Sequence, residues 1–189
     1  MMKIQVPKGC FGYIQRKHIL EVIKTIIYFS VSISLYFAGI EATGNNRNLL
    51  TIVAVLGCLP ASKSMVSMIM FLKYKGCPEE VWEKLGSGHK NLYTLYDMVF
   101  TSYDKNFEID HMAINDKVIC AYSGKEKLDE KACEKHLSDM LSQNGYKNIT
   151  VKIFKDISKY EKRLEQLEEL DERGKVSEGV RTLMLEISL

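Results

Sequence analysis

Two long apolar segments lie close together near the N-terminus and constrain the fold more than any other feature. The first, Thr25–Ile40, reads TIIYFSVSISLYFAGI and has no charged residue. With Lys24 and Glu41–Gly44 it reaches about 20 residues, enough for a helix to span the roughly 30 Å of a bilayer's hydrocarbon core. The second, Leu49–Leu72, follows directly after a short polar loop, Glu41–Asn48. Two such segments are hard to bury in so small a domain, so the sequence predicts a transmembrane helical hairpin rather than two core helices.

The second segment is interrupted by Pro60 and Lys63. A proline inside a helix removes a backbone hydrogen bond, so we expect a kink near Pro60. A lysine at the centre of a bilayer costs about 2.5–3.5 kcal/mol, but near the interface its stem can carry the ammonium group to water. Lys63 therefore either reaches the interface or faces a partner or a polar cavity.

Basic residues flank the two segments unevenly. The outer flanks carry Lys3, Lys8, Arg16, Lys17, Lys24, Lys73 and Lys75, whereas the connecting loop carries only Arg47 against Glu41. Positive charge concentrates in cytoplasmic loops, so the sequence predicts a multi-pass protein of the cell membrane with both termini in the cytoplasm. Three parts are expected: a basic cytoplasmic arm at 1–24, the transmembrane hairpin at 25–75 and a cytoplasmic domain at 76–189.

Residues 76–189 carry the patterns of a small α/β domain that folds on its own. We expect a helix, three strands, a helix, a strand and a helix (α-βββ-α-β-α). Its expected elements are a helix from Pro78, strands at Asp97–Tyr103, Asn106–Ile114 and Lys117–Tyr122, a helix at 128–141, a strand at 149–153 and a helix from Asp156. Leu137, Leu141, Val118, Ile149 and Val151 are expected to share one core. The tail, 180–189, fits a helix or a strand, and a helix is favoured.

Residues that bind metals or nucleotides do not form a recognisable set. The five cysteines include no CxxC pair, which indicates reduced thiols, and Cys133 and His136 are three apart without a matching second pair. His136 lies on an apolar helix face and is expected in the core. No phosphate loop, dinucleotide fingerprint or HExxH motif occurs, so no cofactor and no metal site are expected. A net charge of +2 does not favour nucleic acid as a partner. Only five of the 26 basic residues are arginine, a bias typical of AT-rich bacterial genomes.

The stretch Phe107–Tyr122 contains a recognisable pattern, FEIDHMAI followed by ND and KVICAY. It resembles the central hairpin of nuclease-related NERD domains, which belong to the restriction-endonuclease-like group. The resemblance covers roughly residues 78–156, and the helix, three strands, helix and strand expected here follow the core order of that group. Some members of the family also carry membrane helices.

The resemblance implies a site for a catalytic divalent metal, normally magnesium. Asp110 matches the metal-binding aspartate of the second strand, and Glu80 matches a helix glutamate. The family's Glu-x-Lys on the third strand is missing, because the chain reads Ser123-Gly124-Lys125 there. Lys125 keeps the lysine, but a serine hydroxyl is a poor substitute for a carboxylate ligand. The resemblance therefore implies a degenerate nuclease with Asp110, Lys125 and Glu80 as its remaining site residues.

Three functions fit these observations. The first is a membrane-anchored, non-catalytic interaction or assembly module, whose partners are the lipid bilayer and either another protein or further copies of the chain. The second is a membrane-tethered, NERD-type nuclease. The third, a small transporter or channel subunit, rests on Pro60 and Lys63 alone. The incomplete metal-binding set and the lack of a basic stripe with interleaved aromatic residues favour the first.

Overall fold

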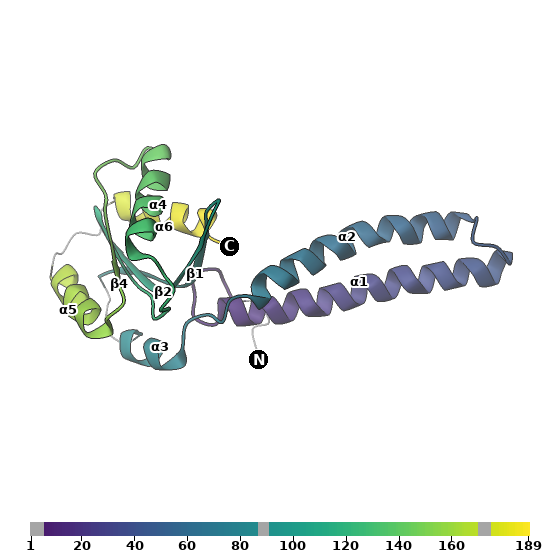
Figure 1. Cartoon of the computed structure of the whole chain (residues 1–189), viewed down its shortest axis with the longest axis horizontal. Helices are drawn as coiled ribbons and strands as arrows, with labels where there is room; N and C mark the ends of the chain where they lie inside the picture. The colour runs from purple at the N-terminus through teal and green to yellow at the C-terminus, as the bar shows by residue number, and fades with distance from the viewer. Residues whose placement is uncertain (1–5, 87–90, 170–174) are drawn as a thin grey trace. The chain divides into compact units, whose positions relative to one another are not determined.

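A computed structural model describes residues 6–86, 91–169 and 175–189. The described chain forms two compact units: Ile14–Lys75 is helical, whereas Val6–Tyr13 and Gly76–Leu189 together form an α/β unit. Figure 1 shows the elements of both units. Two long apolar helices followed by a small mixed domain of sheet and helices are therefore as expected from the sequence.

The helical unit is a hairpin of α1 (Tyr13–Thr43) and α2 (Leu49–Leu72), which lie side by side in Figure 1. Helix α1 begins well before the uncharged segment, so the basic residues from Arg16 to Lys24 are a helical extension of it. Asn48 is the N-cap of α2, and its side chain accepts a hydrogen bond from the Thr51 N–H at 2.8 Å. Helix α2 continues through Pro60.

Small residues form the seam between the two helices. Thr25, Ser32 and Gly39 recur every seven residues on the buried face of α1, and Ala54, Ala61 and Ser64 lie on the buried face of α2. The Thr25 hydroxyl donates to the Ser64 Oγ at 3.0 Å. A Cβ atom at Gly57 would lie 2.7 Å from the Ser32 Oγ, and one at Gly39 would lie 3.0 Å from the Leu50 Cβ. The helices therefore pack closely through small side chains along an antiparallel seam.

Large apolar side chains point away from that seam. Those more than half exposed are Ile19, Ile26, Ile27, Val31, Ile33, Phe37, Leu49, Ile52, Val55, Leu56, Leu59, Val66 and Leu72. The arrangement is the reverse of a water-soluble helical hairpin, in which large apolar residues fill the seam and polar residues face outward.

A polar cluster interrupts the seam near one end of the hairpin. The Glu21 carboxylate is buried and lies 3.4 Å from the Lys17 Nζ and 3.0 Å from the Lys24 Nζ. Ser64 donates to the Glu21 Oε2 at 3.2 Å. Because Glu21 and Ser64 come from different helices, this contact joins α1 to α2 beside the Thr25–Ser64 hydrogen bond.

The α/β unit contains a four-stranded sheet in the order β1-β2-β3-β4. Its elements are α3 (Glu79–Leu85), β1 (Tyr93–Thr101), β2 (Asn106–Asn115), β3 (Val118–Tyr122), α4 (Glu130–Gln143), β4 (Thr150–Phe154), α5 (Ile157–Glu168) and α6 (Lys175–Ile187). The first three strands are antiparallel, and β4 runs parallel to β3 after the α4 crossover. The order agrees with the expected α-βββ-α-β-α, with α6 added.

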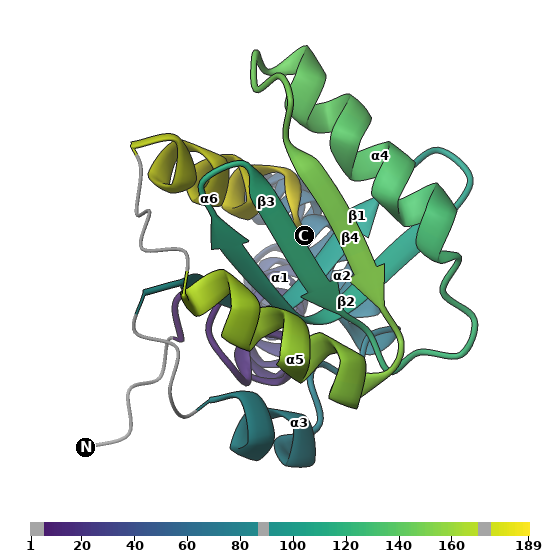
Figure 2. The same ribbon diagram turned by 90° about the vertical axis from the view of Figure 1, so that its left-hand side faces the viewer.

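Helices cover both faces of the sheet, as Figure 2 shows. Ile119 and Ala121 of β3 pack with α4 and α6, whereas Val118 and Cys120 pack with α5. The expectation that Val118 shares one core with Leu137 was therefore wrong, because successive side chains of a strand point to opposite faces. Burial on both faces also explains why β3 is apolar throughout.

The segment Val6–Tyr13, here called the N-terminal strap, lies along the outer edge of β1. The Tyr96 N–H donates to the Gly9 carbonyl at 2.8 Å, and the Lys8 Nζ donates to the Ser188 carbonyl at 2.6 Å. Phe11 stacks on Trp82 with ring centroids 5.1 Å apart. Residues 6–13 of the expected basic arm thus belong to the α/β unit, because apolar packing and edge hydrogen bonds hold them there.

The C-terminal residues complete the same edge. After α6 ends, Ser188 forms an antiparallel bridge with Phe100, and the Leu189 N–H donates to the Val99 carbonyl at 2.8 Å. The tail is therefore helical, as favoured, and its last two residues also pair with a strand. Covering an edge in this way prevents pairing with strands of other chains.

Candidate functional site

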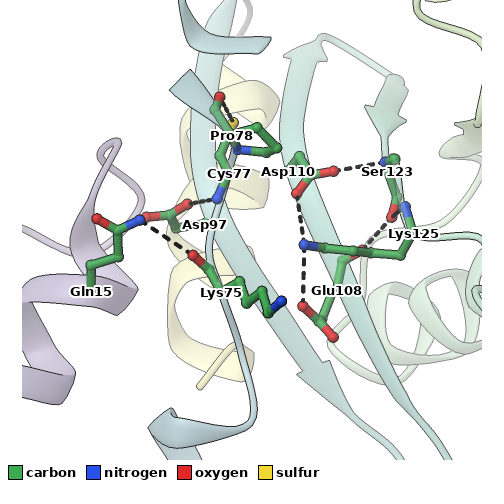
Figure 3. Close-up of polar contacts among 10 residues, drawn as sticks. Gln15, Lys75, Cys77, Pro78, Asp97, Glu108, Asp110, Ser123 and Lys125 are labelled. Carbon is green, nitrogen blue, oxygen red and sulfur yellow. Dashed lines mark hydrogen bonds and ion pairs between the residues drawn. The ribbon is translucent and has the colours of Figure 1, made fainter. Parts of the chain in front are cut away.

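Two of the residues singled out by the sequence resemblance, Asp110 and Lys125, meet where β1, β2 and the segment after β3 adjoin the Gly76–Pro78 turn (Figure 3). Asp97 comes from β1, Glu108 and Asp110 come from β2, and Lys125 follows β3. Asp97 and Asp110 are both almost fully buried. This cluster is the main concentration of charged groups inside the α/β unit among the described residues.

Asp110 is held by donors of the protein itself. Its Oδ2 accepts a hydrogen bond from the Gly124 N–H at 2.7 Å, and its Oδ1 lies 3.8 Å from the Lys125 Nζ. The same Nζ lies 3.6 Å from the Glu108 Oε2. Each oxygen of Asp110 thus faces a donor on the segment after β3, so the side chain ties that segment to β2.

Asp97 lies in β1 between Tyr96 and Met98, which pair with His111 and Ile109 on either side of Asp110, and the sequence did not single it out. Its backbone has a left-handed φ of 55°, an unusual conformation within a strand, and its Oδ1 accepts the Cys77 N–H at 2.6 Å. Gly76, with φ of 74°, allows this close approach, because an added Cβ would lie 3.1 Å from the Asp97 Oδ1. In the sequence, the signal for this irregular backbone is a charged residue, Asp97, between the apolar residues Tyr96 and Met98.

Burial dominates the electrostatics of the cluster. It raises the pKa of Asp110 above its usual value, although the Gly124 N–H and the Lys125 ammonium partly offset the effect, and Asp97 raises it further. Burial, with Asp110 and Asp97 nearby, raises the pKa of the Cys77 thiol to about 12. Cys77 is therefore a neutral thiol near pH 7 and is not prepared to act as a nucleophile.

Ser123 and Glu80 do not complete a metal site around Asp110. The Ser123 side chain is fully buried, and its hydroxyl donates to the Glu108 carbonyl at 2.7 Å, which joins β2 to the segment after β3. Glu80 is exposed on α3. Among the described residues, no three His, Cys, Asp or Glu side chains are placed to share a metal ion. The structure brings Asp110 and Lys125 together but not Glu80.

His111 and His136 pack inside the α/β unit. His111 is fully buried, and its Nδ1 lies 2.8 Å from the Tyr160 hydroxyl, which also lies within hydrogen-bond distance of the Cys120 carbonyl. His136 is half-buried, with its ring 5.5 Å from that of Phe107. Both histidines pack against aromatic rings of the sheet or of α5.

Replacing Asp110 should reveal whether it is a structural anchor. We expect Asp110→Ala to lower the free energy of unfolding by about 1–3 kcal/mol, because the Gly124 N–H loses its acceptor in a buried place. Asp110→Asn keeps an acceptor for the Gly124 N–H, so its free energy of unfolding should fall less near pH 7. Urea unfolding of both variants and the wild type measures this difference, and an alanine variant of unchanged stability would contradict it.

The same variants have an expected pH dependence. Since burial raises the pKa of Asp110 in the folded state, its contribution to stability is present below its unfolded pKa and is lost as the pH rises through the folded value. The wild type should therefore lose stability relative to Asp110→Asn as the pH rises above the unfolded pKa of about 4. A difference that does not change with pH would contradict the raised pKa.

Comparisons of the chain with protein-family models, with curated proteins and with solved structures found no match.

Proposed function

We propose that this chain is a membrane-anchored, non-catalytic interaction or assembly module, in which the helical hairpin spans the bilayer and holds the α/β unit in the cytoplasm. The supporting observation is the reversed packing of α1 and α2, with small residues in the seam and large apolar residues outside. Membrane helices associate through such small residues, because lipid tails are as apolar as leucine side chains.

The lengths and burial of the helices support the same proposal. Helices α1 and α2 have 31 and 24 residues and are apolar enough to cross a membrane. Only 17% of the most apolar 18-residue stretch of each helix is buried, whereas a core helix of a soluble protein is mostly buried. Left in water, their outward faces would form an apolar surface much larger than soluble monomers expose.

Fractionation and reporter fusions test the anchor and its direction. We expect the full chain to stay in the membrane fraction after alkaline carbonate washing. Because basic residues flank the hairpin and the loop is nearly neutral, reporters fused after Asn46 and at the C-terminus should report opposite sides, with the C-terminus in the cytoplasm. Carbonate extraction, or two reporters on the same side, would contradict the transmembrane hairpin.

The charged cluster supports the non-catalytic part of the proposal. Metal-dependent cleavage of a phosphodiester needs carboxylates that converge on a metal, but Asp110 is engaged by Gly124 and Lys125, and Ser123 donates to the backbone. The alternative, a membrane-tethered nuclease of the NERD type, requires an additional ligand in place of Ser123.

A nuclease assay separates the two functions. We expect the purified chain, with magnesium or manganese, to leave DNA and RNA intact. Degradation that disappears in Asp110→Ala, while a folded Asp110→Asn control is also inactive, would overturn the non-catalytic proposal. Degradation that is unchanged in both variants would indicate a contaminating nuclease.

A further inference from the structure

Two lysines lie at the same level of the hairpin, one on each helix. The Thr25–Ser64 hydrogen bond aligns α1 with α2 at this point, and Lys24 and Lys63 are the neighbouring residues. From this level to the close approach of Gly39 and Leu50, each helix advances 14 residues, which is about 21 Å. The lysines therefore mark one end of the uncharged part of the hairpin.

Positive charge exceeds negative charge at this level and over the two turns of α1 that precede it. Lys17 and Lys24 share the Glu21 carboxylate, so one acidic group faces two ammonium groups. Lys63 is exposed, and no carboxylate of the described residues forms an ion pair with it. Lys17, Lys24 and Lys63, here called the basic collar, thus carry a net excess of positive charge when Glu21 is included.

The hairpin itself offers no further acid to another copy. Glu21 and Glu41 are the only acidic residues between Ile14 and Lys75. Glu21 is buried and already bound by two lysines and Ser64, and Glu41 lies 17 residues beyond Lys24, about 25 Å along α1. A carboxylate from a second hairpin is therefore a poor counter-ion for the basic collar.

We propose that the basic collar binds the phosphate of anionic phospholipids in the cytoplasmic leaflet; this inference rests on the proposed membrane anchor. The long lysine stems lie along apolar helix surfaces while their ammonium groups reach the headgroup layer. Each lysine near an anionic membrane surface strengthens binding to acidic lipids by about fivefold. Lys63 contributes most, because Lys17 and Lys24 are partly neutralised by Glu21.

Lipid retention measures the proposed binding. The full chain is reconstituted in nanodiscs that contain equal amounts of phosphatidylglycerol and phosphatidylcholine, released into detergent, and the co-purifying lipids are quantified. We expect phosphatidylglycerol to be enriched over phosphatidylcholine in the wild type and the enrichment to fall about fivefold in Lys63→Gln. Lys131→Gln removes the same charge from an exposed position on α4 and should leave the enrichment unchanged.

Competition with inorganic phosphate identifies what is bound. Millimolar inorganic phosphate should not displace the lipid; displacement would mean that a free anion, rather than a lipid, is the ligand. Equal retention of both lipids, or equal loss in Lys63→Gln and Lys131→Gln, would overturn the inference. A chain that inserts into the nanodisc but shows no lipid preference contradicts this inference alone, whereas a chain that does not insert contradicts the membrane anchor.

Discussion

Residues 76–189 without the N-terminal strap are expected to be about 3 kcal/mol less stable than the same residues with it. The strap contributes the Gly9–Tyr96 backbone hydrogen bond, the Lys8–Ser188 contact and the stacking of Phe11 on Trp82. A backbone hydrogen bond contributes about 1 kcal/mol, an aromatic pair about 1 kcal/mol, and the covered apolar surface the remainder.

Two soluble fragments measure this effect. One is 76–189 alone, and the other joins residues 6–13 to it through a flexible linker in place of the hairpin. Trp82 is the single tryptophan and stacks on Phe11, so its fluorescence reports whether the strap is bound. We expect the second fragment to unfold at a higher urea concentration. Equal stability of the two fragments would contradict a stabilising role of the strap, whereas a cooperative unfolding transition of 76–189 alone is what the sequence patterns predict.

Single substitutions in the strap provide a finer test. Gly9 and Gly12 both have left-handed φ angles, 83° and 78°, so alanine strains the backbone at either position. At Gly9 the new Cβ would also lie 2.7 Å from a Leu185 methyl group and 2.8 Å from one of Leu95, whereas nothing lies within 4 Å at Gly12. Gly9→Ala should therefore be the more destabilising by about 1 kcal/mol.

The second large effect is expected at the seam of the hairpin. A Cβ atom added at Gly57 would lie only 2.7 Å from the Ser32 Oγ, so the larger side chain of Gly57→Leu has no room in the seam. Overpacking of this kind costs about 1–3 kcal/mol, and here it also separates the helices. We expect the variant to lose the close contact between α1 and α2.

A disulfide introduced between the helices reports that contact. The Thr25 and Ser64 hydroxyl oxygens are 3.0 Å apart, so Thr25→Cys with Ser64→Cys should cross-link on oxidation once Cys10 and Cys58 are replaced by serine. Gly57→Leu should reduce the yield strongly. Val66→Leu enlarges an exposed residue of the same helix and should leave the yield unchanged. A low yield without Gly57→Leu would contradict the antiparallel register.

Periodicity in the sequence predicted the elements better than it predicted their packing. The uncharged run Thr25–Ile40 and the alternation in Ile149–Ile153 depend on local residues, and both elements occur as expected. The strap has no helical or alternating pattern, and its contacts with Tyr96 and Ser188 join residues far apart in the chain. Such contacts follow from tertiary packing and cannot be read from local spacing.

The sequence predicted only part of the candidate site, because the rest depends on tertiary packing. The resemblance pointed to Asp110 and Lys125, which the structure brings within 3.8 Å of each other. It also pointed to Glu80, but which face of the short helix α3 is buried depends on its packing against the sheet, and Glu80 lies on the exposed face. The role of Asp97 depends on the register between β1 and β2, which the sequence did not specify.

The hairpin also has a consequence for the order of folding. Gln15 donates to the Lys75 carbonyl at 3.4 Å, so the two ends of the hairpin come close together. For a disordered chain of about 60 residues, bringing the ends together costs roughly 3–4 kcal/mol of loop entropy. Pairing of α1 with α2 already brings the two ends together, so the strap binds β1 without that loss of loop entropy and at a high local concentration. The hairpin should therefore accelerate folding of the α/β unit, and slow pairing of the helices should delay closure of its sheet edge.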